Sequence, residues 1–217
     1  LHRPDWLMDP SEVAGAFAKL KKAGKVKYFG VSNFRPSQVN LLQSALKAPL
    51  VVNQVEASLL HLEPFTDGTL NQCLAEKIAP MAWSPLGGGF LSGKYKPGEM
   101  AKEGTRSAEG WAYPGKHFHP HAEVILSAVL ESAEQLGKSP AQVAIRWILE
   151  QADITSVIVG ARTVEHFDDN VRGSGWSMDP ETLARLNELS APIDKYPERM
   201  EGPRDGQRLS AIDMPSL

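Results

Sequence analysis

Apolar residues recur three or four positions apart in several stretches, and many of these stretches open with the same local device. A Pro stands at the first helical position, where its missing N–H costs no hydrogen bond. Such starts predict helices after Asp9, Arg35, Ser139 and Asp179. Arg35 is a poor cap, so we expect the helix after it to need tertiary support.

Two of these starts also have capping-box spacing, and three further helices are expected elsewhere. Asp9 with Glu12, and Ser139 with Gln142, are separated as the two members of a capping box are. Apolar stripes also follow Asp67 and Thr163 and precede Gly137. The predicted stripes are Val13, Phe17 and Leu20; Val39, Leu42 and Leu46; Leu70, Leu74 and Ile78; Val124, Ala128 and Val129; Val143, Trp147 and Ile148; Phe167 and Val171; and Leu183, Leu186 and Leu189.

Short apolar runs between the helices predict strands at 27–32, 50–55, 79–84 and 155–160. Strands that alternate with helices indicate an α/β fold with a parallel sheet. A doubly wound sheet could use these strands and a stub ending at His2, but no G-x-G-x-x-G follows any of them. A (β/α)8 barrel needs eight, so it would lack its first three to four strand–helix units.

We expect one domain over 1–217, with barrel units in 1–190 and an irregular tail in 191–217. The segment 85–120 is too long for an ordinary connection and is expected to be functional or disordered.

Composition narrows the class of protein further. The chain has 217 residues, a net charge of −3 and no basic tract, which argues against nucleic acid as a partner. No apolar run approaches the ~20 residues of a membrane helix, and no export signal is apparent. The single cysteine, Cys73, excludes an internal disulfide and is expected to be a buried thiol, so a cytoplasmic location fits best.

Ligands bind at the carboxyl ends of the strands in a parallel α/β protein. Amide, hydroxyl and aromatic groups with one imidazole stand there, which suits a flat polar heteroaromatic ring and not a metal. The next loop, SPLGGGFLSGKY, combines adjacent glycines with Lys94 and suits a phosphate. The strand-end groups are His2, Ser32 and Asn33, Gln54 and Glu56, Trp83 and Ser84, and Gly160 to Arg162.

Five ordered motifs carry a resemblance that runs from residue 1 to about Leu189. LHRPD, GKVKYFGVSNF, NQVEASLL, AWSPLGGGFLSGKY and VIVGARTVEHFDDNV together resemble the aldo-keto reductase superfamily. The resemblance implies a (β/α)8 barrel that uses NADPH to reduce aldehydes and ketones to alcohols, without a metal. Many members have a Lys or Arg and a Ser at Gly160 and Ala161, so NADH is the alternative cofactor.

The resemblance also implies roles for individual residues. His2 falls on the active-site His that orients the substrate carbonyl, and Trp83 on the ring that stacks on the nicotinamide. The carboxamide would be held by Ser32, Asn33 and Gln54. The pyrophosphate loop matches Ser84, Pro85, Leu86, Gly88 and Lys94, and the adenine and 2′-phosphate site matches Gly160, Arg162, His166, Asp169 and Asn170.

The family's proton-donating Tyr, with its Lys and Asp, comes from the first half of the barrel. Tyr28, Tyr95, Tyr113 and Tyr196 match none of these contexts, and losing a positioned acid costs about 10²–10⁴-fold in rate. We therefore interpret the chain as the C-terminal part of a reductase that by itself binds cofactor poorly and reduces little. The full-length protein is expected to be a monomer, with an oligomer as the alternative.

Other interpretations stay open. A non-catalytic NADPH-binding regulator similar to potassium-channel β-subunits is one, although those tend to have Asn in place of His2. A half-barrel that closes by pairing with another chain is a second. Simpler interpretations take Trp83 as core, Ser32 and Asn33 as turn formers, 87–89 as a flexible loop and Arg162 as a solvated charge. We expect Trp111 and Tyr113 to line the substrate pocket, and His117, His119 and His121 to belong to a flexible loop.

Overall fold

The computed structural model describes residues 1–98 and 121–191. Its centre is a parallel sheet in the order β1-β2-β3-β4, as the alternating pattern predicted. The strands are β1 (Phe29–Ser32), β2 (Leu50–Glu56), β3 (Ala79–Trp83) and β4 (Ser156–Val157). Sequential order is typical of a singly wound sheet, the kind that closes into a barrel.

Each Pro-containing start does begin a helix. Asp9 Oδ1 accepts from the Ser11 N–H at 2.7 Å, and Ser139 Oγ accepts from the Gln142 N–H at 3.1 Å. The helices are α1 (Pro10–Lys22), α2 (Pro36–Ala45), α3 (Glu63–Thr66), α4 (Thr69–Glu76), the 3₁₀ helix η1 (Gly87–Ser92), α5 (Ala122–Leu136), α6 (Pro140–Leu149), α7 (Val164–Val171) and α8 (Pro180–Ser190). The sequence did not predict α3.

The helix after Arg35 has the tertiary support that its poor cap requires. The Arg35 side chain makes no cap bond, and its backbone N–H donates to Gln38 Oε1 at 2.9 Å. Gln72 of α4 reaches across to α2, where its Nε2 donates to the Pro36 carbonyl at 3.2 Å and to Asn40 Oδ1. A neighbouring helix therefore stabilises this start.

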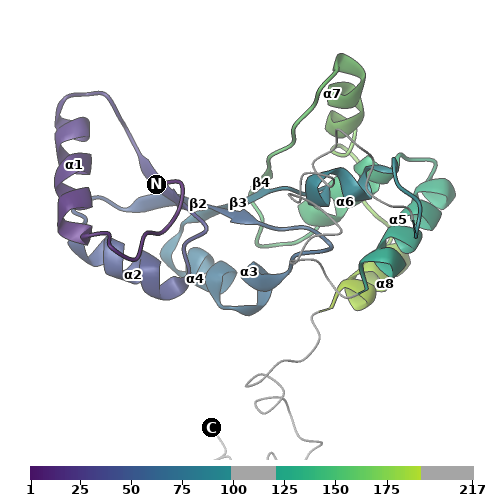
Figure 1. Ribbon diagram of the computed structural model, residues 1–217, viewed down its shortest axis with the longest axis horizontal. Helices are drawn as coiled ribbons and strands as arrows, with labels where there is room; N and C mark the ends of the chain where they lie inside the picture. The colour runs from purple at the N-terminus through teal and green to yellow at the C-terminus, as the bar shows by residue number, and fades with distance from the viewer. Residues whose placement is uncertain (99–120, 192–217) are drawn as a thin grey trace, which may run out of the picture.

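The helices cover one face of the sheet. Figure 1 shows α2, α3 and α4 along one side, with α1 and α7 at opposite ends. In β2, Asn53 and Val55 are buried beneath these helices, whereas Val52, Gln54 and Glu56 alternate onto the other face and are half-buried. No described helix lies over that second face between α1 and α7.

Two apolar clusters hold the sheet to its helices. The smaller joins β1 to α1 and α2 and includes a stacked pair, Phe17 and Phe29, with ring centroids 4.1 Å apart. Cys73 is buried in it, as expected. The larger joins β2 and β3 to α5, α6 and α8, and Trp147 is its largest fully buried side chain.

Several predicted stripe residues do not reach the core. Leu74 is 70% exposed, and Cys73 rather than Leu74 faces the sheet. Val124 is also exposed, whereas Ala128 and Val129 are buried. In α7, Phe167 and Val171 are 56% and 49% exposed, so the predicted stripe lacks a described partner.

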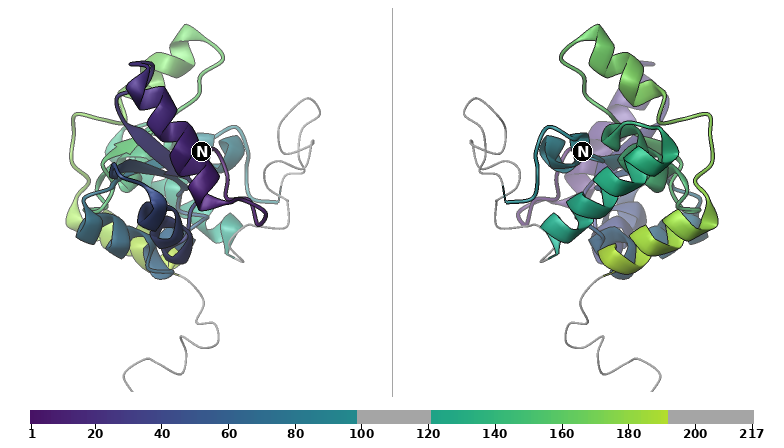
Figure 2. Two further views of the ribbon diagram at one scale, coloured as in Figure 1. Left: turned by 90° about the vertical axis from the view of Figure 1, so that its left-hand side faces the viewer. Right: turned by 90° about the vertical axis from the view of Figure 1, so that its right-hand side faces the viewer.

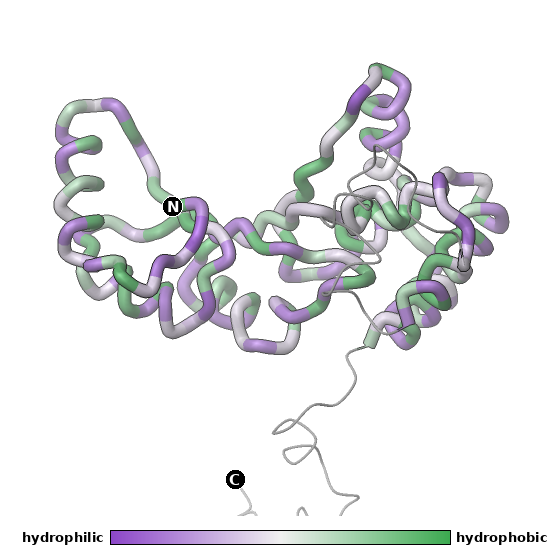
Figure 3. The backbone as a smooth tube through the Cα atoms, in the orientation of Figure 1, coloured by the Kyte–Doolittle hydropathy of each residue, from purple (hydrophilic) through white to green (hydrophobic). Residues whose placement is uncertain are grey.

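The end of the molecule that carries α7 stands apart from the rest. In both views of Figure 2, α7 projects beyond the other described helices. The segment that joins β4 to α7 is hydrophobic over part of its length (Figure 3), and it includes Ile158, which is 38% exposed.

Some sequence predictions fall outside the described residues. They concern Trp111, Tyr113, His117, His119, Tyr196 and nearly all of the tail, 192–217. None of the described helices is both long and apolar enough to cross a membrane.

Candidate active site at the carboxyl ends of the strands

Three predicted side chains and one backbone carbonyl meet where the first three strands end. Trp83 Nε1 donates to Asn33 Oδ1 at 2.9 Å, and Asn33 Nδ2 donates to Ser32 Oγ at 3.0 Å. Ser32 Oγ in turn donates to the Gln54 carbonyl at 2.9 Å. The parallel register sets Ser32 opposite Gln54, and Gln54 opposite Met81, so this chain of hydrogen bonds crosses adjacent strands.

The backbone at these strand ends is strained. Asn33 and Ser84 have φ values of 60° and 59°, in the left-handed region that side chains rarely adopt. The Asn33 N–H still continues the ladder, donating to the Gln54 carbonyl at 2.8 Å. Both β1 and β3 therefore end in a sharp turn that directs the next side chain to the sheet edge.

A hollow of about 360 Å³ adjoins this group, and both Asn33 and Trp83 line it. It extends from the strand ends, where Glu56 also lines it, to Pro64 of α3. His61 Nδ1 lies 3.3 Å from Glu63 Oε2 on the same wall. Ser32 and Gln54 do not line it.

The Gly-rich loop forms η1 directly after β3. Gly87, Gly88 and Gly89 all have positive φ, which glycine adopts without strain. Ser84 Oγ accepts from the Gly88 N–H at 3.3 Å, which ties the loop to the strand end. A Cβ on Gly89 would lie 2.9 Å from Lys94 Nζ, so the ammonium lies against this glycine.

Two other loop residues, Pro85 and Leu86, are held by packing. Pro85 is buried, and Leu86 is half-buried against the larger apolar cluster. Within the loop, the N–H groups of Gly87 and Gly89 donate to the Ser84 and Leu86 carbonyls, each at 2.9 Å, which holds its shape.

The predicted residues around α7 divide into two kinds. Arg162 and His166 are exposed, and the His166 N–H donates to the capping Thr163 Oγ1 at 3.2 Å. Asn170 is buried, and its Nδ2 donates to the Gly160 carbonyl at 3.1 Å. Asp169 is half-buried and bonded to α6.

The carboxylate of Glu165, in the first turn of α7, is stabilised locally. Hydrogen bonds from its own backbone and from the Thr163 side chain lower the pKa of this exposed group. The side chain is therefore anionic at neutral pH.

His2 is exposed and lies next to the edge strand. The amino group of Leu1 donates to the Gly30 carbonyl at 2.8 Å, so the chain runs beside β1 here. His2 does not line the hollow between Asn33 and Trp83. The structure thus brings the side chains of Ser32, Asn33 and Trp83 together around the Gln54 carbonyl, while the Gln54 amide contacts Met81 Sδ and His2 stays outside the group.

Sequence reasoning missed the two partners of Asp169. Ser139 Oγ donates to Asp169 Oδ2 at 2.7 Å, and Gln142 Nε2 donates to Asp169 Oδ1 at 2.6 Å. The available signal was the Ser139–Gln142 spacing, which was interpreted as a capping box. The Ser139 side chain does accept from the Gln142 N–H as a capping box requires, but the Gln142 side chain bonds to Asp169 of α7.

Over 1–98 and 121–191, no three His, Cys, Asp or Glu side chains gather as a metal site would need.

Comparison with known families gives a match over most of the chain. The model of the Aldo/keto reductase family matches residues 1–191. This range contains every described element and all the strand-end residues discussed above.

Curated relatives support the same assignment. A 6-dehydroglucose reductase of Agrobacterium fabrum is 36% identical over 191 residues, covering 88% of this chain and 55% of its own length. An L-glyceraldehyde 3-phosphate reductase of Escherichia coli O157:H7 is 30% identical, with 86% and 56% covered. A putative voltage-gated potassium channel subunit beta of Schizosaccharomyces pombe is 30% identical, with 87% and 57% covered.

Solved structures agree on the fold. A glycerol dehydrogenase from Gluconobacter oxydans superposes with a TM-score of 0.71 at 25% identity, covering 89% of this chain and 59% of that one. A thermostable aldo-keto reductase superposes with a TM-score of 0.67 at 22% identity, and 58% of it is covered. The chain thus spans little more than half the length of these proteins, and its four parallel strands are part of a (β/α)8 barrel.

Proposed function

Because the chain belongs to the aldo/keto reductase family, we propose that it supplies the cofactor-binding part of an enzyme that reduces aldehydes or ketones to alcohols. The observation that carries the proposal is the hydrogen-bonded group of Trp83, Asn33 and Ser32 at the carboxyl ends of the strands. When bound there, NADPH would supply the hydride that the carbonyl carbon receives.

The Asn33 amide fits the carboxamide of a nicotinamide. Its oxygen has two lone pairs and accepts from Trp83, and its nitrogen has two N–H groups and donates to Ser32. One lone pair and one N–H have no partner among the described residues. A primary carboxamide presents the matching donor and acceptor, so Asn33 could bind it through two hydrogen bonds.

The Trp83 ring is fixed at one edge by its bond to Asn33 and is half-buried against the hollow. An indole held in this way offers a flat face for stacking on a pyridine ring. Gln54, on the strand between those of Asn33 and Trp83, would add its amide to the same ligand.

The Gly-rich loop suits the pyrophosphate. Gly88 and Gly89 have no Cβ to keep an approaching anion from the backbone, and Lys94 supplies a positive charge beside Gly89. Arg162, exposed before α7, would pair with a 2′-phosphate through a bidentate guanidinium. This arrangement favours NADPH over NADH.

His2 is proposed as the residue that donates a hydrogen bond to the substrate carbonyl oxygen. The contact of Leu1 with Gly30 supports this role, because it holds His2 next to the strand that leads to Ser32 and Asn33. The protonating Tyr of the family would come from outside this chain.

A second candidate is a regulator that binds NADPH without turnover. The similarity to the potassium channel subunit beta of Schizosaccharomyces pombe favours it, but His2 favours the enzyme. For either function we propose a cytoplasmic, monomeric full-length protein without a membrane span or a nucleic-acid partner. For the enzyme we also propose a small carbonyl substrate.

Titration of the protein with NADPH tests the proposal, with the fluorescence of the cofactor as the signal. We expect Trp83→Ala to weaken binding at least tenfold, because the stacking surface is lost. Trp6→Ala is the control, since Trp6 is 95% exposed. Equal affinities for both variants would contradict the cofactor site.

Turnover of a reactive aldehyde by a full-length version then separates the two candidates. Oxidation of NADPH that depends on the aldehyde supports the reductase. Tight cofactor binding without turnover would exclude it in favour of the regulator.

A further inference from the structure

Helix α7 is attached to the rest of the protein mainly through polar contacts. Of its residues only Asn170 is buried, whereas Val164 is 71% exposed and Phe167 56%. Apolar packing on the described residues therefore does little to fix this helix. Its position depends on the side chains that bond it to its neighbours.

Asp169 makes the most extensive of these attachments. Both of its carboxylate oxygens are used, one accepting from Ser139 Oγ at 2.7 Å and the other from Gln142 Nε2 at 2.6 Å. Ser139 also caps α6, because its Oγ accepts from the Gln142 N–H. The carboxylate thus sits at the N-terminus of α6, where the helix dipole favours a negative charge.

Neighbouring contacts hold the rest of this region. Asn170 Nδ2 donates to the Gly160 carbonyl, which ties α7 to the loop that carries Arg162. Gly173, just after α7, packs so closely on Ile145 of α6 that a Cβ would lie 2.8 Å from Ile145 Cγ2.

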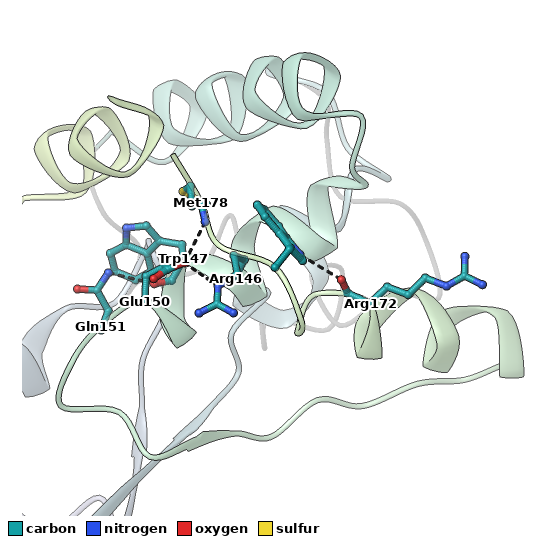
Figure 4. Close-up of polar contacts among 7 residues, drawn as sticks. Arg146, Trp147, Glu150, Gln151, Arg172 and Met178 are labelled. Atoms are coloured by element: carbon teal, nitrogen blue, oxygen red, sulfur yellow. Dashed lines mark hydrogen bonds and ion pairs between the residues drawn. The ribbon is translucent and has the colours of Figure 1, made fainter. Parts of the chain in front are cut away.

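The segment after α7 is bonded to the other end of α6. Figure 4 shows Glu150 between Arg146 and Met178: its Oε1 lies 3.0 Å from Arg146 Nε and accepts from the Met178 N–H at 2.9 Å. The Trp176 indole donates to the Arg172 carbonyl at 3.1 Å.

We propose that Ser139, Gln142 and Asp169 form a clamp that positions α7, and that Asp169 acts through this clamp rather than as a ligand of the adenosine part of the cofactor. Both carboxylate oxygens of Asp169 are bonded to α6, whereas Arg162 and His166 are exposed. The clamp would hold α7 and its loop so that Arg162 meets a 2′-phosphate. This inference rests on the proposed function.

Removal of either partner tests the clamp. Gln142→Met removes the amide donor without touching the cap, and Asp169→Asn removes the carboxylate. We expect each variant to bind adenosine 2′,5′-bisphosphate about three- to thirtyfold more weakly in calorimetry. Because both break the same bond, the double variant should bind no more weakly than Asp169→Asn alone.

Asp168→Asn is the matched control, since this exposed neighbour on α7 loses the same charge. A combined Gln142→Glu and Asp169→Asn variant reverses the donor and acceptor and should recover part of the lost affinity. Recovery would not occur if Asp169 bound the ligand itself.

Hydrogen exchange of the α7 amides gives a readout that needs no ligand. We expect Gln142→Met and Asp169→Asn to accelerate exchange across Val164–Val171 and to leave α8 unchanged. Unchanged exchange in Gln142→Met would overturn the clamp. Loss of affinity in Asp169→Asn with normal affinity in Gln142→Met would assign Asp169 as a ligand instead.

The two proposals can fail separately. If the unmodified chain binds neither adenosine 2′,5′-bisphosphate nor 5′-AMP, the cofactor site and the ligand part of this inference are both wrong. The exchange experiment then still supports or overturns the clamp as the attachment of α7.

Discussion

Asn33 illustrates how much one residue does at a strand end. Its backbone occupies the left-handed region, which Asn tolerates better than most side chains, and its amide links Trp83 to Ser32. A larger or branched residue would strain the turn, and an apolar one would leave the indole N–H without its partner. The same residue therefore shapes the backbone and fixes the ring.

Trp83→Phe tests the value of that indole bond. The substitution keeps an aromatic ring but removes the donor to Asn33, so we expect a loss of about 1 kcal/mol in the free energy of unfolding. NADPH affinity should fall about five- to tenfold as the ring loses its orientation. Denaturant unfolding and fluorescence titration measure the two effects.

Trp147→Phe is the matched control for this prediction. Trp147 Nε1 also donates to an Asn oxygen, that of Asn187, at 2.8 Å. We expect the Trp147→Phe substitution to destabilise the protein without changing its affinity for the cofactor. An equal loss of affinity in both variants would mean that global stability, not the strand-end bond, controls binding.

The buried thiol of Cys73 should make the protein less stable at alkaline pH. Burial is the main cause that raises the pKa of its thiol from 9.0 to about 11. Above pH 9 the unfolded chain releases the thiol proton while the folded chain keeps it, so stability falls as pH rises from 9 through 11. The loss is about 2–3 kcal/mol at most.

Comparison with Cys73→Ala isolates this effect, because other groups also titrate there. The variant should start less stable, since it leaves a small cavity, but should lose less on going from pH 8 to 11. Parallel pH curves for the two proteins would contradict the prediction.

At the scale of elements, close approach of backbones decides which glycines are essential. A Cβ on Gly30 would lie 2.2 Å from Val52 Cγ1 on the adjacent strand, where the register of β1 and β2 also shifts. Gly15 in α1 has nothing within 4 Å of the same position. A methyl group would therefore be accommodated at position 15 but not at position 30.

Gly30→Ala should destabilise the protein by about 3 kcal/mol, because the strands must separate to admit the methyl group. Gly15→Ala should instead stabilise it by about 0.5–1 kcal/mol, since Ala favours the helix. Thermal unfolding of both variants measures the difference. A neutral Gly30→Ala would show that β1 can shift without cost.

At the scale of the whole molecule, the described sheet has two free edges. Among the described residues β1 pairs only with β2, and β4 only with β3. Large apolar side chains are exposed near both ends, including Trp6 and Leu7 before α1 and Phe167 on α7. Free edges and exposed apolar groups favour association with further chain.

We therefore expect the 217-residue chain, produced alone, to self-associate at micromolar concentration. Leu7→Asp and Phe167→Asp should reduce the associated fraction in light scattering after size exclusion. Leu74→Asp is the control, because Leu74 is equally apolar and 70% exposed but lies on α4, away from both ends. A monodisperse monomer at all concentrations would contradict this prediction.

The sequence by itself determined the order of the elements and the groups at the strand ends. Pro-containing starts and apolar periodicity are local signals, so the helices after Asp9, Ser139 and Asp179 could be predicted. Ser32, Asn33, Gln54 and Trp83 could be grouped because parallel strands end at one edge of a sheet.

Tertiary structure alone decided which faces are buried and where polar side chains find partners. Leu74 matches the helical period as well as Leu70, but only the contact with the sheet selects Cys73 and exposes Leu74. Gln142 has the spacing of a capping box, yet its amide bonds to Asp169, which lies 27 residues away in the sequence. Periodicity describes one element at a time, whereas burial and hydrogen bonding depend on which elements meet.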